Sequence, residues 1–262
     1  MRHTTIRSMV VTLALAAPAM AEEPLRLTYQ TYAVGLHIAD AEGMLGLGPW
    51  TYQLALSFRT TGLANAVFGG HHASSVHGTW NGDRPSPRQY ASNGAWRGEP
   101  RATLIDYDQG IPAIRQLLPP LEPEREIVAD NLQVNTTDSL SALVALIRTV
   151  TRSGQCESRI RTYDGRRAAE IVAHTAGQEM LEATSRSSFS GRALRCDFVS
   201  RMLGGFRLDE AIKTDYRPLL GSAWLAAAIP KRPPIPVRMT IETRWFGDAT
   251  SYLTGIGDSV GQ

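Results

Sequence analysis

Residues 50–58 read WTYQLALSF and place a large apolar side chain at every second position. Successive side chains in a β-strand point to opposite faces of the sheet, so this alternation predicts a strand with one buried face. The buried face would carry Trp50, Tyr52, Leu54, Leu56 and Phe58. The sequence Thr-Thr-Gly at residues 60–62 ends the run. A strand this apolar on one side predicts a sheet that covers a core.

The same alternation recurs in several other segments. Strands are predicted from Leu25 to Tyr29, around Leu194 to Phe198, and near the C-terminus, where residues 252–256 would return beside the preceding strand after a turn at residues 247–248. Residues 160–163 and 169–174 flank an Asp-Gly pair, which supplies the positive φ angles of a tight hairpin. The C-terminal alternation runs through Val237, Met239, Ile241 and Trp245. These patterns predict a mainly β domain over residues 22–262.

One segment has the period of a helix instead. Apolar residues recur at i, i+3, i+4 and i+7 from Leu140 to Ile147, which predicts an amphipathic helix. Thr137 or Asp138 is placed to cap its start, and residues 152–154 mark its end. The charged, proline-rich segment 119–126 is predicted to be a surface loop.

Strands and helix together predict a curved, mostly antiparallel sheet, an open or half barrel, wrapped around one amphipathic helix. A helix of this length is short for so wide a sheet, so residual apolar space is expected inside. The predicted lining of this concave interior is Trp50, Tyr52, Leu54, Leu56, Phe58, Val237, Met239, Ile241 and Trp245.

The N-terminus has the three parts of a secretory signal peptide. Arg2 and Arg7 precede an apolar run from residue 9 to residue 20, and Ala19 and Ala21 supply the small residues of a cleavage site. The apolar run is shorter than the roughly 20 residues of a transmembrane helix. We therefore expect residues 1–21 to be cleaved and the remaining chain to be exported to the periplasm.

The charge balance limits the classes of partner. The chain has 27 basic and 25 acidic residues, and two of the basic residues belong to the predicted signal peptide. A chain with nearly equal numbers of basic and acidic residues gives no electrostatic basis for binding nucleic acid. The most apolar later segment, residues 223–229, is stopped by Pro230 and is too short to span a membrane, so no membrane-spanning segment is predicted.

Cys156 and Cys196 are the only cysteines. An even number of cysteines in an exported protein predicts a disulfide. The alternatives, a metal site or a catalytic thiol, lack neighbouring ligands and a redox-motif spacing.

Two clusters of polar side chains have the composition of a possible site. Alternation places His71 and His77 on one face of a strand beside His72, but no carboxylate or thiol follows closely enough to complete a metal site. Arg159, Arg161, Arg166 and Arg167 gather around the predicted hairpin, and a solvated strand face is favoured over a phosphate site. No metal, cofactor or catalytic residue is therefore predicted.

Several short motifs resemble the exported bacterial family called domain of unknown function 3108. They are Leu27-Thr28-Tyr29, Thr60-Thr61-Gly62-Leu63, Asp138-Ser139-Leu140-Ser141, Cys156 with Tyr163-Asp164-Gly165-Arg166-Arg167, and Pro236-Val237-Arg238. The resemblance implies export and a β-rich fold, and it carries no catalytic residue or cofactor. The expected architecture is also similar to the open half-barrels of periplasmic lipoprotein carriers, which is an analogy of fold alone.

Three functions are compatible with these features. The leading hypothesis is a non-catalytic periplasmic binding or chaperone-like protein for an apolar ligand, such as a lipid or a lipoprotein, in envelope biogenesis. The second is an envelope hydrolase with dispersed catalytic residues, in which His71, His72, His77 or His174 acts as the base. The third is a structural protein of the envelope.

Overall fold

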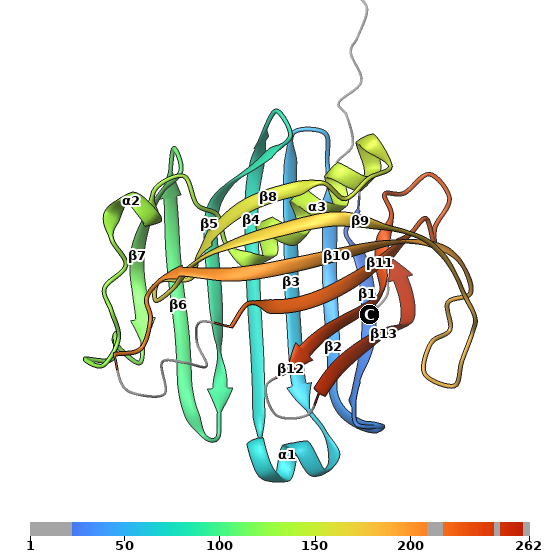
Figure 1. The fold of residues 1–262 in the computed structure, drawn as a ribbon, viewed down its shortest axis with the longest axis horizontal. Coiled ribbons are helices and arrows are strands. Elements are labelled where there is room, and N and C mark those ends of the chain that lie inside the picture. The colour runs from blue at the N-terminus through green and yellow to red at the C-terminus, as the bar shows by residue number, and fades with distance from the viewer. Residues whose placement is uncertain (1–22, 209–216, 244–246, 259–262) are drawn as a thin grey trace, which may run out of the picture.

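The computed structural model describes residues 23–208, 217–243 and 247–258 (Figure 1). Its described strands form one antiparallel sheet of thirteen strands in the order β7-β6-β5-β4-β3-β2-β1-β13-β12-β11-β10-β9-β8. The first half of the chain therefore moves outward from β1 strand by strand, and the second half returns from the opposite edge to β13. The sheet ends at β7 and β8 and does not close into a barrel.

Seven strands form the N-terminal half-sheet. They are β1 (Leu25–Ala33), β2 (Leu36–Leu47), β3 (Thr51–Thr60), β4 (Gly70–Asn81), β5 (Arg84–Trp96), β6 (Glu99–Asp108) and β7 (Ile111–Leu118). Six more form the C-terminal half-sheet: β8 (Ser158–Tyr163), β9 (Ala168–Leu181), β10 (Gly191–Gly204), β11 (Leu219–Ala226), β12 (Ile235–Thr243) and β13 (Gly247–Asp258). The helices are α1 (Gly62–Phe68), α2 (Asp130–Gln133) and α3 (Ser139–Ser153).

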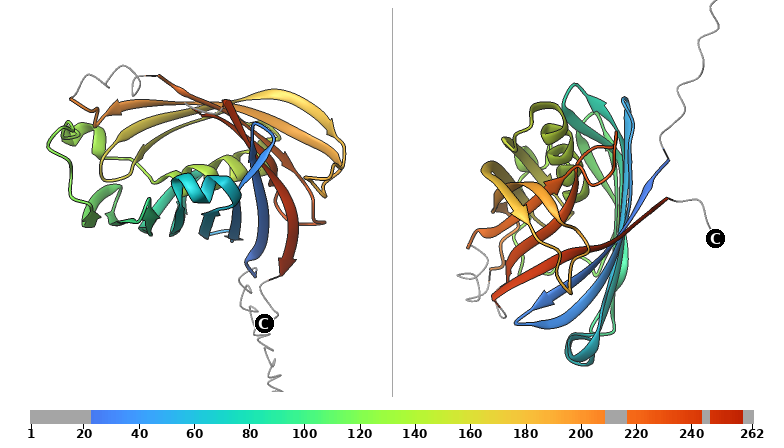
Figure 2. Two further views of the ribbon diagram at one scale, coloured as in Figure 1. Left: turned by 90° about the horizontal axis from the view of Figure 1, so that it is seen from below. Right: turned by 90° about the vertical axis from the view of Figure 1, so that its right-hand side faces the viewer.

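The two half-sheets lie as two crossing layers with α3 between them (Figure 2). They are continuous where β1 pairs with β13. Side chains from the inner faces of both layers and from α3 form one apolar core. The predicted fold, a curved antiparallel sheet around one amphipathic helix, is confirmed.

The predicted helix is confirmed as α3, with its apolar side buried. Val144 and Ile147 are almost completely buried, because both layers contact the helix. Asp138 is the N-cap: its Oδ1 accepts a hydrogen bond of 2.8 Å from the backbone nitrogen of Ser141. Gly154 ends the helix with a left-handed conformation, which glycine adopts without steric cost.

A buried chain of hydrogen bonds fixes the first turn of α3 to the sheet. Ser141 Oγ donates to Asp138 Oδ2 at 2.6 Å, and the Tyr52 hydroxyl from β3 donates to Ser141 Oγ at 2.8 Å. Burial raises the pKa of Asp138 above its ordinary value, although the two donors of Ser141 act in the opposite direction. Protonation of this carboxyl therefore stabilises the folded state relative to the unfolded state.

The raised pKa of Asp138 predicts a pH dependence of stability. The contribution of this carboxyl is complete below about pH 4 and is lost as the pH rises through the raised folded-state pKa. Asparagine caps a helix as well as aspartate does but does not titrate. We expect the difference in unfolding free energy, wild type minus Asp138→Asn, to fall as the pH rises from about 4 towards neutrality. Urea denaturation over this range measures it, and a difference independent of pH would contradict the prediction.

The disulfide between Cys156 and Cys196 is confirmed, with an S–S distance of 2.06 Å. Both residues are completely buried. The bond connects the segment after α3 to the middle of β10. It therefore fastens the end of the helix to the inner face of the C-terminal half-sheet.

Two predictions about strand ends are wrong. Trp50 does not share the buried face of β3, since it precedes that strand and its side chain is 79% exposed. The backbone turns here, with Gly48 N donating to Thr51 O, so the alternation breaks before residue 51. Residues 247–248 are not a turn either: Gly247 is the first residue of β13 and pairs with Thr243.

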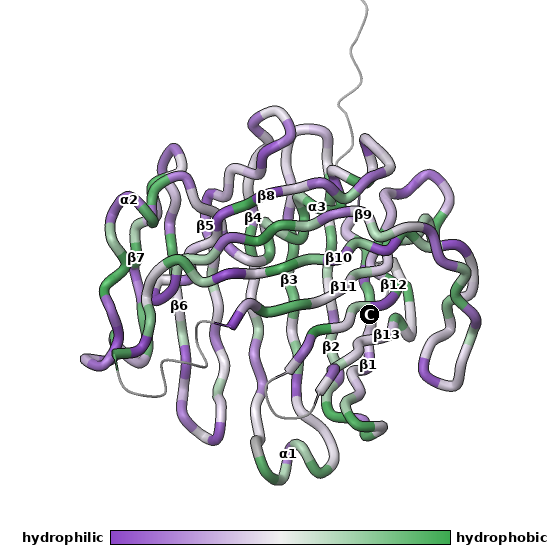
Figure 3. Tube along the Cα trace, viewed as in Figure 1, coloured by the Kyte–Doolittle hydropathy of each residue, from purple (hydrophilic) through white to green (hydrophobic). Residues whose placement is uncertain are grey.

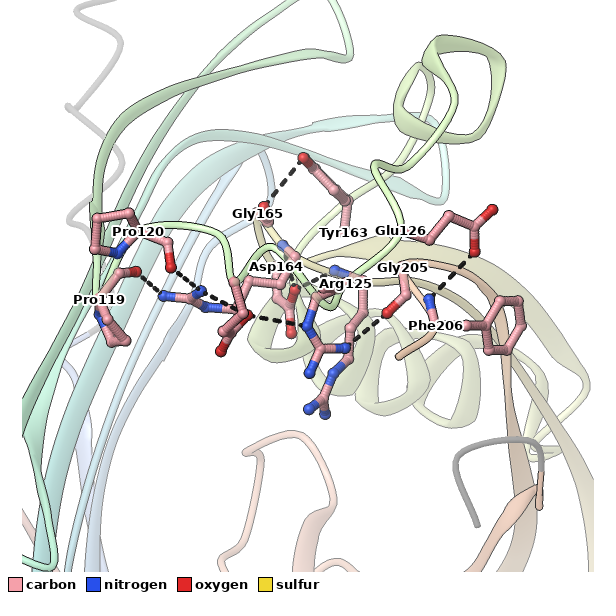
Figure 4. A network of polar contacts seen from close by, with 12 residues as sticks. Pro119, Pro120, Arg125, Glu126, Tyr163, Asp164, Gly165, Gly205 and Phe206 are labelled. Carbon is pink, nitrogen blue, oxygen red and sulfur yellow. Dashed lines mark hydrogen bonds and ion pairs between the residues drawn. The ribbon is translucent and has the colours of Figure 1, made fainter. Parts of the chain in front are cut away.

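The gap between the sheet edges is bridged by a polar cluster, which we call the edge latch: Glu122, Arg125 and Arg166 with their backbone partners (Figure 4). The guanidinium of Arg166, in the β8–β9 turn, donates to the carbonyls of Pro119 and Pro120 and lies 3.4 Å from Glu122 Oε2. Arg125 binds Glu122 at 3.1 Å and donates to the Gly205 carbonyl at 2.7 Å.

The edge latch corrects the prediction that the four arginines form a solvated face. Arg166 is mostly buried, because its acceptors come from the segment that follows β7. Its neighbour Arg167 is exposed, as predicted. A side chain on Gly165 would meet Leu117 of β7 at 3.2 Å, so the turn packs directly against the far edge of the sheet.

Candidate functional site

The core is packed at one end of the interior and open at the other. On β3, Tyr52 and Leu54 are buried near α3, while Leu56 and Phe58 further along the same face are half-buried. The inner face of β12 shows the same change, from buried Val237 through half-buried Met239 to exposed Ile241. The interior therefore opens away from α3, towards α1 (Figure 1).

An apolar groove of about 600 Å³ lies at this open end. We call it the mouth groove. Its lining residues are Ala33, Val34, Leu36, Ile38, Ala39, Phe58, Thr60, Leu63, Ala64, Val67, Trp96 and Arg97. All but Thr60 and Arg97 are apolar, so the groove offers a hydrophobic surface with one polar and one cationic group.

Backbone contacts hold α1 beside the groove. Thr61 N donates to Ile38 O of β2 at 2.9 Å, which fixes the start of the helix. The hydroxyl of Thr60 donates to the Gly70 carbonyl and accepts from the Gly70 nitrogen, closing the loop that contains α1. Seen from below, α1 lies at the opening between the two layers (Figure 2, left).

The β5–β6 turn forms the other wall. The ring of Trp96 lies across Gly70, where a side chain would come within 2.5 Å of the ring, so only glycine fits at this position. The backbone nitrogen of Arg97 donates to the Gly69 carbonyl at 2.9 Å. These contacts connect the end of α1 to the turn and give the groove a fixed shape.

Two other surface grooves contain several charged side chains. A groove of about 630 Å³ near the β4–β5 turn, α3 and β8 has six charged residues in its lining, of which Arg159 and Glu170 pair with each other at 2.7 Å. A groove of about 550 Å³ over the outer face of β1 to β4 contains Asp40, which pairs with His37 at 2.9 Å and Arg59 at 3.8 Å. The mouth groove is therefore the candidate site for an apolar ligand.

The described histidines lie on different strands and faces of the sheet. His71 and His77 lie on the outer face of β4, while His72 points inward and contacts Phe58, with the two rings tilted and their centroids 5.7 Å apart. Burial lowers the pKa of His72, and the adjacent His71 adds to this effect. His174 lies on β9, opposite Asp197. Within the described ranges, no three histidine, cysteine or acidic side chains are grouped as metal ligands would be.

The predicted lining residues thus have different positions. Tyr52, Leu54 and Val237 belong to the packed core, and Phe58 reaches the mouth groove. Trp245 and the predicted signal peptide lie outside the described residues. Sequence reasoning missed α1, although the uncharged run GLANAVF at residues 62–68 was a signal for it.

A comparison with known protein families identifies the family of this chain. The family model described as "Protein of unknown function (DUF3108)" matches residues 27–254. The chain belongs to this family. The DUF3108 match includes the mouth groove, the edge latch and the disulfide, and it confirms the resemblance drawn from the motifs.

A solved structure shows a likeness of fold to the DUF3108 chain. A β-barrel-like protein of domain of unknown function DUF1849 from Brucella abortus has a TM-score of 0.51 and 11% identity, covering 92% of this chain and 99% of its own. A putative exported protein with a YmcC-like fold from Bacteroides fragilis has a TM-score of 0.35 and 11% identity, covering 91% and 97%. No curated protein matches the chain.

Proposed function

We propose that this protein binds an acyl chain of a lipid or a lipoprotein in the mouth groove, as a non-catalytic carrier or chaperone of the periplasm. The observation that carries the proposal is the apolar lining of a groove held open by backbone contacts at one end of the core. Its volume of about 600 Å³ falls in the range of roughly 300–1,000 Å³ found for small-molecule sites.

The energetics of the groove favour an apolar ligand. Burying exposed apolar surface contributes roughly 25 cal/mol per Å², and the walls are already ordered before any ligand arrives. An acyl chain would cover Phe58, Leu36 and Ile38 without leaving a buried polar group unpaired. Arg97 is the one charged residue in the groove lining.

The disulfide supports the proposed location. Structural disulfides persist in oxidising compartments such as the bacterial periplasm and are rare in the cytosol. The Cys156–Cys196 bond therefore agrees with export, as does the tripartite pattern of the first 21 residues.

Filling the groove is expected to abolish ligand uptake. Ala39 lines the groove, so Ala39→Trp places an indole where the acyl chain would lie. We expect the affinity for a fluorescent fatty acid, measured by saturable titration without vesicles, to fall by about tenfold or more, which corresponds to at least about 1.4 kcal/mol.

The matched control is Ala73→Trp, the same change at a half-buried position on the outer face of β4. It should leave the affinity unchanged, and urea denaturation verifies that both variants fold. Wild-type protein that shows no saturable binding, or equal losses in the two variants, would refute acyl-chain binding in this groove.

A further inference from the structure

The helix beside the mouth groove is unusually apolar for its exposure. None of its seven residues is charged, and the side chains of Leu63 and Val67 are 71% and 64% exposed. The β1–β2 turn next to it exposes Val34 at 71% and also Leu36. We call these four side chains the mouth rim. Much of α1 is coloured as hydrophobic (Figure 3).

A helix on the surface of a globular protein normally directs polar side chains to water. Contiguous exposed apolar groups mark surfaces that contact another molecule or a membrane. The mouth rim comes from two segments that project at the same end of the molecule, where the interior opens (Figure 2). The rim would therefore be the first part of the protein to touch an apolar phase.

The arginines near the rim favour contact with an anionic surface of another molecule or membrane. Arg59, just before α1, has a side chain that is 76% exposed and lies 3.8 Å from Asp40. Arg186 donates to the Gly35 carbonyl of the β1–β2 turn at 3.4 Å, with its guanidinium over the ring of Tyr32. Arg97 occupies the β5–β6 turn, with Glu99 following. Apolar side chains next to arginines are typical of segments that lie in the interface of an anionic bilayer.

We propose that the mouth rim inserts into the surface of an anionic lipid bilayer, with the mouth groove opening towards the acyl chains. The mouth groove is continuous with the rim, because Leu63 and Val67 line one and form the other. A chain passing from bilayer to groove would then cross little water. The transfer of an acyl chain from the bilayer to the groove rests on the proposed function. Insertion of the rim does not, because vesicle binding is measured without an acyl ligand.

The test is co-sedimentation of the exported chain with vesicles of phosphatidylethanolamine and phosphatidylglycerol. The variant Leu63→Asp/Val67→Asp places two carboxylates in the rim, where insertion into a bilayer is strongly disfavoured. We expect its partition coefficient to be at least about tenfold below that of the wild type.

The control variant is Ile127→Asp/Met180→Asp, which changes two exposed apolar residues outside the mouth groove. It changes the net charge by the same amount as Leu63→Asp/Val67→Asp does. It therefore measures how much binding is lost through electrostatic repulsion from the anionic vesicles alone. We expect it to sediment as the wild type does. Equal losses of vesicle binding in the two variants would show that the effect comes from the net charge alone, and would overturn the proposal.

A second measurement locates the contact. Cys156 and Cys196 are bonded, so Ala66→Cys gives a single thiol on the exposed side of α1 for an environment-sensitive dye. Its emission should shift to the blue when vesicles are added. Wild-type protein that stays in the supernatant, or an unshifted dye on sedimented protein, would overturn the proposal.

The remaining outcomes separate this proposal from its rivals. A dimer in light scattering that Leu63→Asp/Val67→Asp dissociates would assign the rim to a second copy of the chain and overturn bilayer docking. Ala39→Trp should lose fatty-acid binding and keep vesicle binding. Failure of acyl-chain binding with intact vesicle association would therefore leave the membrane contact standing.

Discussion

Replacing Cys156 and Cys196 together by serine is expected to lower the free energy of unfolding by about 4 kcal/mol. The bond closes a loop over a sequence separation of 40 residues, and the chain-entropy model gives about this value for such a loop. The loop contains β8, β9 and the start of β10. Urea denaturation of wild type and variant measures the loss, which is a large share of the about 5–15 kcal/mol of an ordinary domain.

Reduction provides the control for this prediction. Wild-type protein treated with a thiol reductant should unfold at the same urea concentration as the double variant. A thiol assay on denatured, unreduced protein should detect no free cysteine. Two titratable thiols per chain, or an unchanged midpoint in the variant, would contradict the predicted role of the bond.

Arg166→Ala is expected to cost about 2–3 kcal/mol, because it removes charge-assisted hydrogen bonds to two carbonyls and a carboxylate. The carbonyls of Pro119 and Pro120 would lose their donor, and Glu122 would keep only Arg125. Because this contact joins the two edges of the sheet, amide hydrogen exchange should accelerate in β7 and β8 more than in β1.

The neighbouring arginine supplies the matched control. Arg167 is exposed, so Arg167→Ala should change the unfolding free energy by no more than about 0.5 kcal/mol. Arg166→Lys should restore little, because an ammonium cannot reproduce the fork that reaches several acceptors. Equal effects of the two alanine variants would show that the edge latch contributes nothing specific.

The elements that the sequence predicted are those with a complete local period. The inner face of β3, the amphipathic side of α3 and the Asp-Gly turn between β8 and β9 are each encoded within about fifteen residues. The disulfide followed from cysteine count and export context. Trp50 was misplaced because a local pattern does not show where the backbone turns at the end of a strand.

The candidate site was predicted only in part, because its parts come from separated segments. Helix α1 has seven residues, too few to establish a period, and its start is fixed by a hydrogen bond to Ile38. The role of Arg166 depends on acceptors that lie 44 to 47 residues away in sequence. Phe58 was predicted at the interior, whereas the side chains that give the mouth groove its apolar rim were not.

The pairing of β1 with β13 has a consequence for the order of folding. Residues 25–33 find their partners at residues 249–258, a sequence separation above 200, while β2 to β7 pair only with strands that are their neighbours in sequence. Local hairpins form faster than contacts that close long loops. A chain synthesised from its N-terminus can thus assemble the first seven strands early, but β1 keeps an unpaired edge until β13 emerges. During that interval the nascent protein exposes a strand edge that another chain could pair with.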